Sequence, residues 1–244
     1  MEMQRLDKLL SGTGKWSRRE VKLLVKQGRV LADGAPAPAP ETKYDPETAV
    51  LAVDGEPVVL SRYTWVMMNK PAGVLSATED GRGQTVLDLL PTELQKLELF
   101  PVGRLDKDTE GLLLLTNDGQ TAHRLLSPKY HVDKVYYART AGRLEEADSR
   151  AFESGMTLED GLVCLPAGLE ILSAGGTSEC LVTLREGKFH QVKRMLAFRG
   201  KPVLYLKRLS MGKLTLDAAL DSGGFRLLAE EERQMLQNGE SGIG

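Results

Sequence analysis

The chain of 244 residues is poor in cysteine and histidine and has no long apolar segment. Its only two cysteines, Cys164 and Cys180, belong to no CxxC pair, and its three histidines are scattered. Because zinc sites need clustered Cys and His ligands, we expect no bound metal and interpret both cysteines as buried reduced thiols. No apolar run approaches the roughly 20 residues that cross a bilayer, so we expect no membrane partner.

Phosphate-binding loops and a targeting segment are also missing. The sequence contains neither a GxGxxG nor a GxxxxGKS/T pattern, which excludes the common nucleotide-binding loops. The N-terminal residues alternate between charged and apolar and lack the apolar core of a signal peptide. We therefore expect a cytoplasmic protein without a cofactor, in which ordinary side chains perform any chemistry.

The net charge of −2 conceals an uneven distribution. Residues 1–31 contain eight Lys and Arg residues and three acidic ones, a net charge of +5, which leaves −7 for the rest of the chain. A basic segment of this kind indicates contact with nucleic acid.

The N-terminal residues, 1–60, have the pattern of a small module. Residues 4–11 repeat leucine at helical spacing, and Ser17 with Glu20 fits a capping box that begins a second helix ending near Gly28. The second helix has a basic outer side, which consists of Arg18, Arg19, Lys22 and Lys26. Short strands at 29–32, 49–53 and 57–60 complete the unit, and we expect the domain boundary near Ser61.

From residue 61 to residue 236 the pattern changes to short strands, turns and a few helices. This mixture predicts an α+β domain with a large, mostly antiparallel mixed sheet and flanking helices. The predicted strands are 65–69, 111–116, 134–140, 162–165, 169–173, 179–185 and 202–209. The predicted helices are 85–90, 120–126, 145–154, 188–199 and 229–236. The last residues, 237–244, fit a disordered tail.

The stretch Phe100–Gly119 places three acidic residues, Asp106, Asp108 and Glu110, in a polar loop before a strongly apolar strand. Loops held by rigid strands often carry catalytic groups. On these residues alone, however, a solvated loop is the simpler interpretation.

Two further stretches could complete a site. On the predicted helix 188–199, His190, Lys193 and Arg194 fall on neighbouring positions. They fit a solvated basic face, or cations that hold a carboxylate or a phosphate. Tyr136, on the predicted strand 134–140, either packs in the sheet or stacks on a base.

Together these stretches resemble a known family. Gly103–Gly119 is similar to the signature of the RNA pseudouridine synthases that modify ribosomal RNA. Met68–Gly73, Lys134–Tyr136 and Glu186–Met195 resemble the family's other motifs and occur in the same order. The resemblance spans roughly residues 4 to 235 and implies the pseudouridine synthase fold, an RNA substrate and no cofactor.

Two shorter matches refine this resemblance. Arg5–Leu10 and Ser17–Arg19 resemble the small RNA-binding module of ribosomal small-subunit protein four. Ser127-Pro128 and His190–Met195 resemble the branch of the family that makes a single pseudouridine in small-subunit (16S) ribosomal RNA. We therefore expect that RNA, or an assembly intermediate containing it, to be the partner of a monomeric protein.

The resemblance also implies roles for single residues. Asp106 matches the catalytic aspartate, Tyr136 matches the tyrosine that packs on the target base, and Lys193 matches the basic residue that pairs with the aspartate. Relatives have arginine or lysine at this last position, and lysine lacks the bidentate fork of arginine. Arg104 matches an arginine that helps to hold the RNA open. The residues expected to contact RNA are Arg5, Lys8, Arg18, Arg19, Lys22, Lys26, Arg104, Lys188, His190 and Arg194.

The chemistry explains why these residue types are needed. The target base must first leave its stack, which costs a few kcal/mol, and an aromatic side chain restores about 1–3 kcal/mol of stacking. An ionised Asp106, favoured by the cation at position 193, can then act as nucleophile or base on the nucleotide.

Three other hypotheses remain open on the sequence. A non-enzymatic RNA-binding or ribosome-assembly protein would use the basic N-terminal module but would not need Asp106. A synthase with the same chemistry could act on large-subunit (23S) RNA. A hydrolase is disfavoured, because no Ser/His/Asp or paired-carboxylate arrangement is visible.

Overall fold

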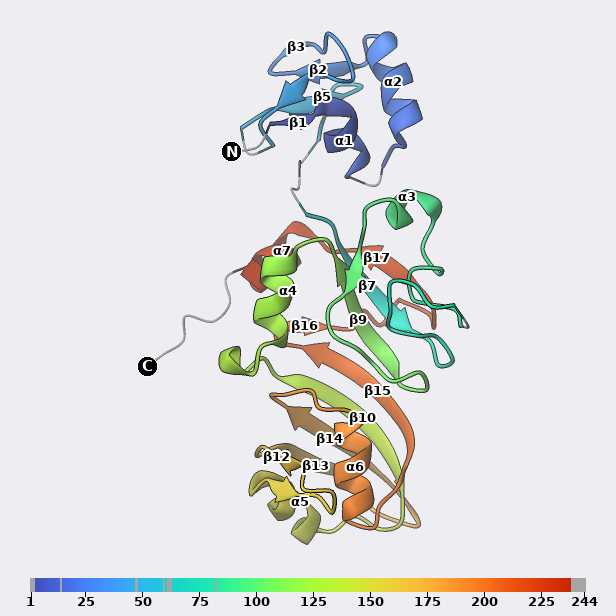
Figure 1. The fold of residues 1–244 in the computed structure, drawn as a ribbon, viewed down its shortest axis with the longest axis vertical. Coiled ribbons are helices and arrows are strands. Elements are labelled where there is room, and N and C mark those ends of the chain that lie inside the picture. Colours follow the sequence, from blue (N-terminus) through green and yellow to red (C-terminus); the bar gives the residue numbers. More distant parts are fainter. Residues whose placement is uncertain are drawn as a thin grey trace. The chain divides into compact units, whose positions relative to one another are not determined.

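The computed structural model describes residues 3–13, 15–46, 48–58, 60, 63–81 and 83–237. They form two compact units, shown as ribbons in Figure 1. The N-terminal unit contains the chain up to Thr64 together with Leu90–Leu99, and the second unit contains Trp65–Leu89 and the chain from Phe100 onward. The predicted boundary near Ser61 and the tail from residue 238 lie outside the described residues.

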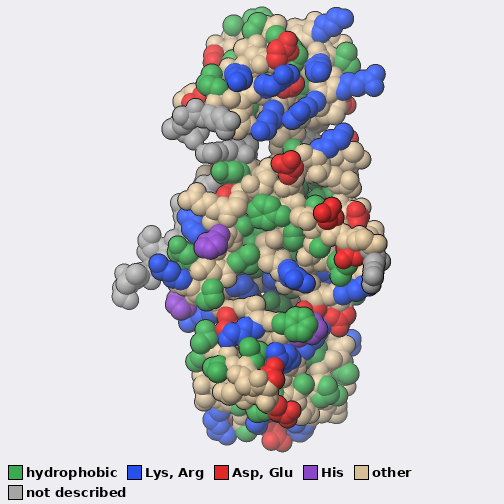
Figure 2. Space-filling model, in the orientation of Figure 1, with side chains coloured by type: hydrophobic (Ala, Val, Ile, Leu, Met, Phe, Trp, Pro, Cys, Tyr) green, Lys and Arg blue, Asp and Glu red, His purple; other side chains and the backbone are tan. Residues whose placement is uncertain are grey.

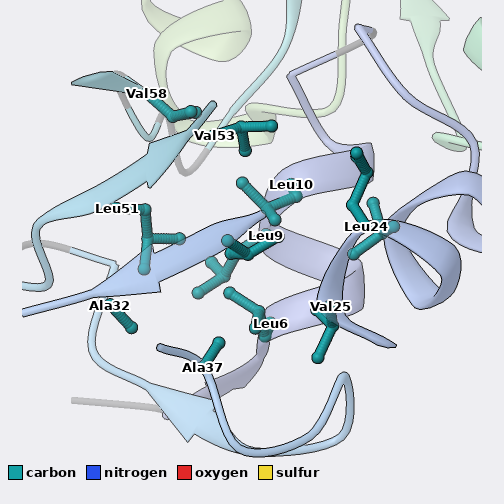
Figure 3. Close-up of a cluster of buried hydrophobic side chains, with 12 residues drawn as sticks. Leu6, Leu9, Leu10, Leu24, Val25, Ala32, Ala37, Leu51, Val53 and Val58 are labelled. Atoms are coloured by element: carbon teal, nitrogen blue, oxygen red, sulfur yellow. The ribbon is translucent and has the colours of Figure 1, made fainter. Parts of the chain in front are cut away.

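The N-terminal unit contains the helices α1 (Leu6–Ser11) and α2 (Arg18–Lys26) and a four-stranded sheet of order β3-β2-β5-β6. Leucine and valine side chains from the helices and the sheet form one buried cluster (Figure 3), which holds the unit together through burial of apolar surface. The short helix α3 (Thr92–Gln95) also belongs to this unit. The strands of the unit are β1 (Gln4–Arg5), β2 (Val30–Ala32), β3 (Ala35–Pro36), β4 (Lys43–Tyr44), β5 (Leu51–Val53) and β6 (Glu56–Val58).

Helix α2 begins and ends as predicted. The backbone amide of Glu20 donates to the Ser17 hydroxyl at 3.3 Å, and the Ser17 amide donates to the Glu20 carboxylate at 2.7 Å, which completes the capping box. Gly28, just beyond the helix, has a φ of +70°, a conformation that glycine adopts without strain. The apolar side of α2 is buried and its basic side is exposed.

The second unit is built on a nine-stranded sheet whose main path is β13-β14-β10-β15-β9-β7-β17, with β16 paired to β15 and β8 paired to β9. Among the described strands, the pairing of β15 with β9 is the one parallel step. The predicted class, α+β with a mostly antiparallel mixed sheet, is therefore confirmed. The strands are β7 (Trp65–Lys70), β8 (Phe100–Pro101), β9 (Glu110–Thr116), β10 (Lys134–Ala141), β13 (Gly168–Ser173), β14 (Thr177–Leu184), β15 (Val203–Met211), β16 (Leu214–Thr215) and β17 (Phe225–Leu227).

Helices and one small hairpin accompany this sheet. Helix α5 contacts β13, α6 contacts β15, and α4 contacts α7. The helices are α4 (Gly119–Leu126), α5 (Glu146–Glu153), α6 (Gln191–Phe198) and α7 (Glu230–Gln237), and a 3₁₀ turn covers Pro128–Tyr130. The hairpin pairs β11 (Met156–Thr157) with β12 (Val163–Cys164). Nowhere in the described ranges is a helix both long and apolar enough to cross a membrane.

Two helix predictions need correction. The predicted helix 85–90 is wrong: Thr85 forms a parallel bridge with Leu75, and turns follow it. Pro91 disfavours a helical backbone at Leu90, and the Asp88 amide donates to the Thr85 carbonyl at 3.2 Å, which closes a turn. The predicted helix 188–199 begins only at Gln191, because His190 has a left-handed backbone with a φ of +52°.

Candidate active site

The loop before strand β9 is fixed to the middle of the large sheet by a close backbone approach. Gly111 lies opposite Arg208 of β15 in the parallel pairing, with a φ of +99°. A Cβ atom at this position would lie only 2.2 Å from the Arg208 carbonyl oxygen, so no other residue fits without moving a strand. The acidic loop therefore leaves the sheet at a defined place.

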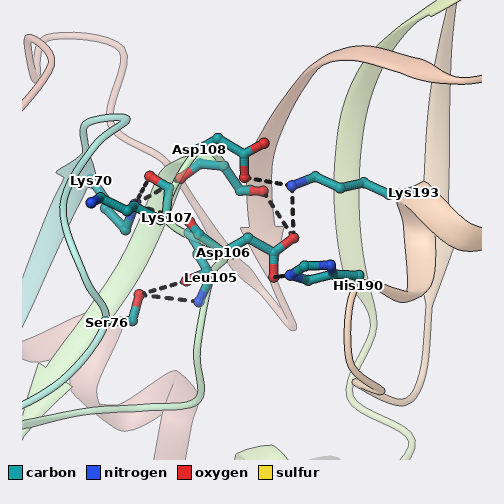
Figure 4. Close-up of polar contacts among 9 residues, drawn as sticks. Lys70, Ser76, Leu105, Asp106, Lys107, Asp108, His190 and Lys193 are labelled. Carbon is teal, nitrogen blue, oxygen red and sulfur yellow. Dashed lines mark hydrogen bonds and ion pairs between the residues drawn. The ribbon is translucent and has the colours of Figure 1, made fainter.

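Lys70, at the end of β7, holds this loop from inside the protein (Figure 4). Its side chain is completely buried, and its ammonium donates to the carbonyl oxygens of Thr109 at 2.9 Å and of Asp106 at 3.2 Å. It also donates to the Pro71 and Lys107 carbonyls at 2.9 and 3.3 Å. Burial lowers the pKa of Lys70 to about 8.

Ser76 fixes the same loop at a second point. Its hydroxyl donates to the Leu105 carbonyl at 3.0 Å and accepts from the Leu105 amide at 3.1 Å (Figure 4). These two contacts and three of the four made by Lys70 bind the backbone on both sides of the Asp106 side chain. The carboxylate of Asp106 is left to point away from them.

The Asp106 carboxylate lies beside two side chains of the segment that begins helix α6 (Figure 4). Its Oδ2 is 2.9 Å from the Lys193 ammonium, and its Oδ1 is 3.5 Å from His190 Nε2. The Asp106 and Lys193 side chains are 23% and 21% exposed, so the pair is partly shielded from water. Charges in such a setting interact more strongly than at an open surface.

Asp108 shares the same cation. Its Oδ1 is 2.5 Å from the Lys193 ammonium, although 75% of its side chain is exposed. The hydrogen bond from Lys193 holds the pKa of Asp108 below its usual value. Burial by itself would lower the pKa of Lys193, but the hydrogen bonds to Asp108 and Asp106 outweigh it and raise that pKa.

An open cleft lies over this ion pair. About 430 Å³ of space there is not filled by protein atoms, and part of it is open to solvent. Asp106, Lys193 and Tyr136 all line the cleft, and so does Arg104. Tyr136, on β10, is 8% exposed, so its ring forms part of the wall. Together these groups provide a carboxylate, a cation and an aromatic face in one cavity.

The other expected RNA contacts divide into two groups. Lys188 and Arg194 form ion pairs, with Glu186 at 2.8 Å and with Asp160. Arg5 pairs with Asp7 at 2.8 Å. The remaining cations are exposed and form no ion pair with the described residues. They are Lys8, Arg18, Arg19, Lys22 and Lys26 on helices α1 and α2, and Arg104 at the cleft.

Sequence reasoning left some of the site's residues without a role. Lys70, in the Met68–Gly73 motif, fitted either the floor of the cleft or a strand end before a proline turn, and Asp108 was one of three acidic residues in a loop. A lysine at the end of a largely apolar strand was the available signal for Lys70, because a buried ammonium needs several acceptors. In the part of the chain that the structure describes, no three His, Cys, Asp or Glu side chains form a possible metal site.

Comparisons with known proteins agree with this geometry. Residues 64–198 match the family described as RNA pseudouridylate synthase, and residues 4–50 match the S4 domain. An uncharacterised RNA pseudouridine synthase of Bacillus subtilis is 52% identical and is aligned over 95% of this chain and 98% of its own. The ribosomal small subunit pseudouridine synthase A of Vibrio cholerae is 40% identical, over 93% and 97% of the two chains.

A solved structure also resembles the whole chain. The crystal structure of a pseudouridylate synthase superposes with a TM-score of 0.67 at 33% sequence identity, covering 96% of this chain and 99% of its own. Both the sequence and the arrangement of strands are therefore shared with proteins of one family.

Proposed function

Because this chain belongs to the RNA pseudouridine synthase family and is an RNA pseudouridine synthase, we propose that it converts one uridine of small-subunit ribosomal RNA to pseudouridine, with Asp106 as the catalytic carboxylate. The observation that carries the proposal is the 2.9 Å pair of Asp106 with Lys193 in an open cleft walled by Tyr136. The choice of small-subunit RNA as the target is supported by the Vibrio cholerae relative, which is named for the ribosomal small subunit.

The target uridine has to reach this cleft by leaving its helix or stack. Unstacking costs a few kcal/mol, which phosphate contacts to exposed cations offset. The buried ring of Tyr136 then lies against the everted uracil and returns about 1–3 kcal/mol of stacking. Arg104, exposed at the cleft without an ion pair among the described residues, is available for the flanking phosphates.

The chemical step needs a carboxylate that is ionised when the uridine arrives. The Lys193 ammonium lies 2.9 Å from the Asp106 carboxylate, and Lys70 and Ser76 hold the loop that carries Asp106. Asp106 acts on the nucleotide as nucleophile or base while the bond from ribose C1′ to uracil N1 breaks. C1′ is then joined to C5, N1 gains a proton and C5 loses one, so the product is an isomer.

The cleft also keeps the two fragments together. A freed uracil held between Tyr136 and the Asp106 loop stays close to C1′, and this proximity favours rejoining over loss of the base to water. The cytoplasmic location and the monomeric state that the sequence suggests stay predictions.

Mapping of pseudouridine tests the proposal. Small-subunit and large-subunit RNAs from cells lacking the protein are each incubated with wild type and with Asp106→Asn, and pseudouridines are located by sequencing. We expect one new pseudouridine in small-subunit RNA with wild type and none with the variant. Modification confined to large-subunit RNA would refute the proposed target, and equal product from both proteins would refute the role of Asp106.

A further inference from the structure

The segment Glu186–Gln191 is a turn held by its own buried polar groups. The Gln191 side chain accepts from the Lys188 amide at 3.0 Å and donates to the Glu186 carboxylate at 2.6 Å. Glu186 also accepts from the Leu165 amide at 2.9 Å. Glu186 and Gln191 are only 5% and 3% exposed, so this network fixes the turn firmly.

This rigid turn exposes an aromatic ring to water. Phe189 is 73% exposed, more than any other large apolar side chain in the described part of the protein. Its neighbour His190 has a left-handed backbone with a φ of +52°, which costs free energy for a residue other than glycine. A single exposed apolar residue needs no explanation, but here the turn that carries Phe189 is strained at His190 and is held by the hydrogen bonds of Gln191.

The Phe189 ring stacks on His190, which is a wall residue of the active-site cleft. The two ring centroids are 3.8 Å apart and the planes are inclined by 18°. On the cleft side, His190 Nε2 is 3.5 Å from the Asp106 carboxylate. The stacked rings therefore extend from the catalytic carboxylate to the outside of the cleft, where the ring of Phe189 is largely uncovered.

We propose that the Phe189–His190 ring pair is a stacking platform for a nucleobase of the RNA strand beside the everted uridine. The inference rests on the proposed function, because eversion separates the target from the base that was stacked on it. Tyr136 stacks on the everted base inside the cleft, whereas Phe189 stacks on a neighbouring base outside it. Stacking on an aromatic side chain accepts any base, so the platform adds affinity without reading sequence.

A double-mutant cycle between protein and RNA tests this platform. The protein variants are Phe189→Leu, which removes the ring, and Phe189→Tyr, which keeps it. Phe198→Leu is the matched control, since Phe198 is also an exposed phenylalanine, at the end of α6, but unlike Phe189 it stacks on no described residue that lines the cleft. The RNA is a fragment containing the uridine that wild type modifies, with an abasic nucleotide placed in turn at each flanking position.

We expect Phe189→Leu to weaken binding of the intact fragment about 5- to 150-fold, the range for removal of one stacked base. Phe189→Tyr and Phe198→Leu should stay within about twofold of wild type. One abasic position should weaken binding to wild type by a similar factor yet have little further effect on Phe189→Leu, because both changes remove the same stacking interaction.

Two outcomes would overturn the platform. One is that Phe189→Leu binds the fragment with unchanged affinity. The other is that the loss of binding free energy in Phe189→Leu is fully additive with the loss caused by an abasic nucleotide at every position tested. Because the Phe189 ring is exposed, we expect the variants to melt at the same temperature as wild type. Equal melting temperatures exclude misfolding as the cause of weaker binding. If wild type modifies no ribosomal RNA, the proposed function is wrong and this inference is wrong with it. If wild type is active and Phe189→Leu binds RNA with unchanged affinity, only the stacking platform is wrong.

Discussion

Cations are used differently on helix α2 and around the start of helix α6. On α2, Arg18, Arg19, Lys22 and Lys26 are exposed and form no ion pair with any described residue. In the segment around the start of α6, Lys193, Lys188 and Arg194 each pair with a carboxylate. Unpaired cations can neutralise phosphates and release counterions, whereas paired cations fix geometry. Counting charge in the sequence does not separate the two uses.

Among the cations, the largest effect is expected where a cleft lysine is removed. Lys193→Met should lower the single-turnover rate by about 100-fold or more, because Asp106 and Asp108 lose the shared ammonium. Lys193→Arg should stay within about tenfold, since the charge remains and only its geometry changes. Rapid-quench measurement of pseudouridine with saturating enzyme gives both rates. If the methionine variant keeps the wild-type rate, the cation has no part in the chemistry.

The second-largest effect is expected for Lys70, because it holds the loop of Asp106 but is too deeply buried to contact the substrate. Lys70→Met removes the donor to three loop carbonyls, and we expect an activity loss of about 10- to 100-fold from a displaced Asp106. Binding of RNA should change little. A variant that loses affinity but not rate would contradict this positioning role.

The pH dependence of Lys70 sharpens the same point. Its pKa of about 8 in the folded protein lies below the ordinary 10.5, so the folded state releases this proton first as the pH rises. Between these values the unfolded chain binds more protons, and the contribution of Lys70 to the free energy of unfolding increases with pH. Denaturant unfolding at pH 8 to 10 should therefore show a steeper rise for wild type than for Lys70→Met. Equal slopes would show that Lys70 does not titrate in this range.

A smaller and different effect is expected on α2. Replacing Arg18, Arg19, Lys22 and Lys26 by glutamine should reduce the slope of log affinity against log salt by about 0.7–0.9 for each phosphate that is no longer neutralised. The rate at saturating RNA should stay near the wild-type value, because these cations position nothing in the cleft. Filter binding from low to high salt provides the slope. An unchanged slope would mean that α2 does not meet the phosphate backbone.

The smallest effect is expected for a cation that is already paired. The double variant Arg194→Gln with Asp160→Asn preserves the net charge and removes one exposed ion pair. Its salt slope should equal that of wild type, and its rate should remain within about twofold. A reduced slope would show that Arg194 reaches phosphate in the complex, and the contrast with α2 would then be weaker.

Local signals predicted much of this structure. The Ser17–Glu20 capping box and the glycine after α2 were correct because both depend on neighbouring residues. The apolar run that became β9 was also correct, since its residues are buried on both faces. That Lys70 holds the loop of Asp106 could not be predicted, because the carbonyls that it binds lie almost forty residues away along the chain.

The errors have the same origin. The start of α6 at Gln191 is set by side-chain bonds within the turn and by the contact of Glu186 with Leu165, which a helical periodicity does not contain. Strand β17 was missed because its short segment pairs with β7, some 150 residues earlier. Which cations are paired is likewise a tertiary property, so α2 and the cleft looked alike in the sequence.

The two carboxylates that share Lys193 provide the most direct test of the central claim. Asp106 lines the cleft and Asp108, 75% exposed, does not, yet both lie within 3 Å of the same ammonium. Single-turnover rates of Asp106→Asn and Asp108→Asn on the same ribosomal RNA should differ by about 100-fold or more, with Asp106→Asn at least 1,000-fold below wild type and Asp108→Asn within about tenfold of it. Similar rates for the two variants, or an active Asp106→Asn, would contradict the account.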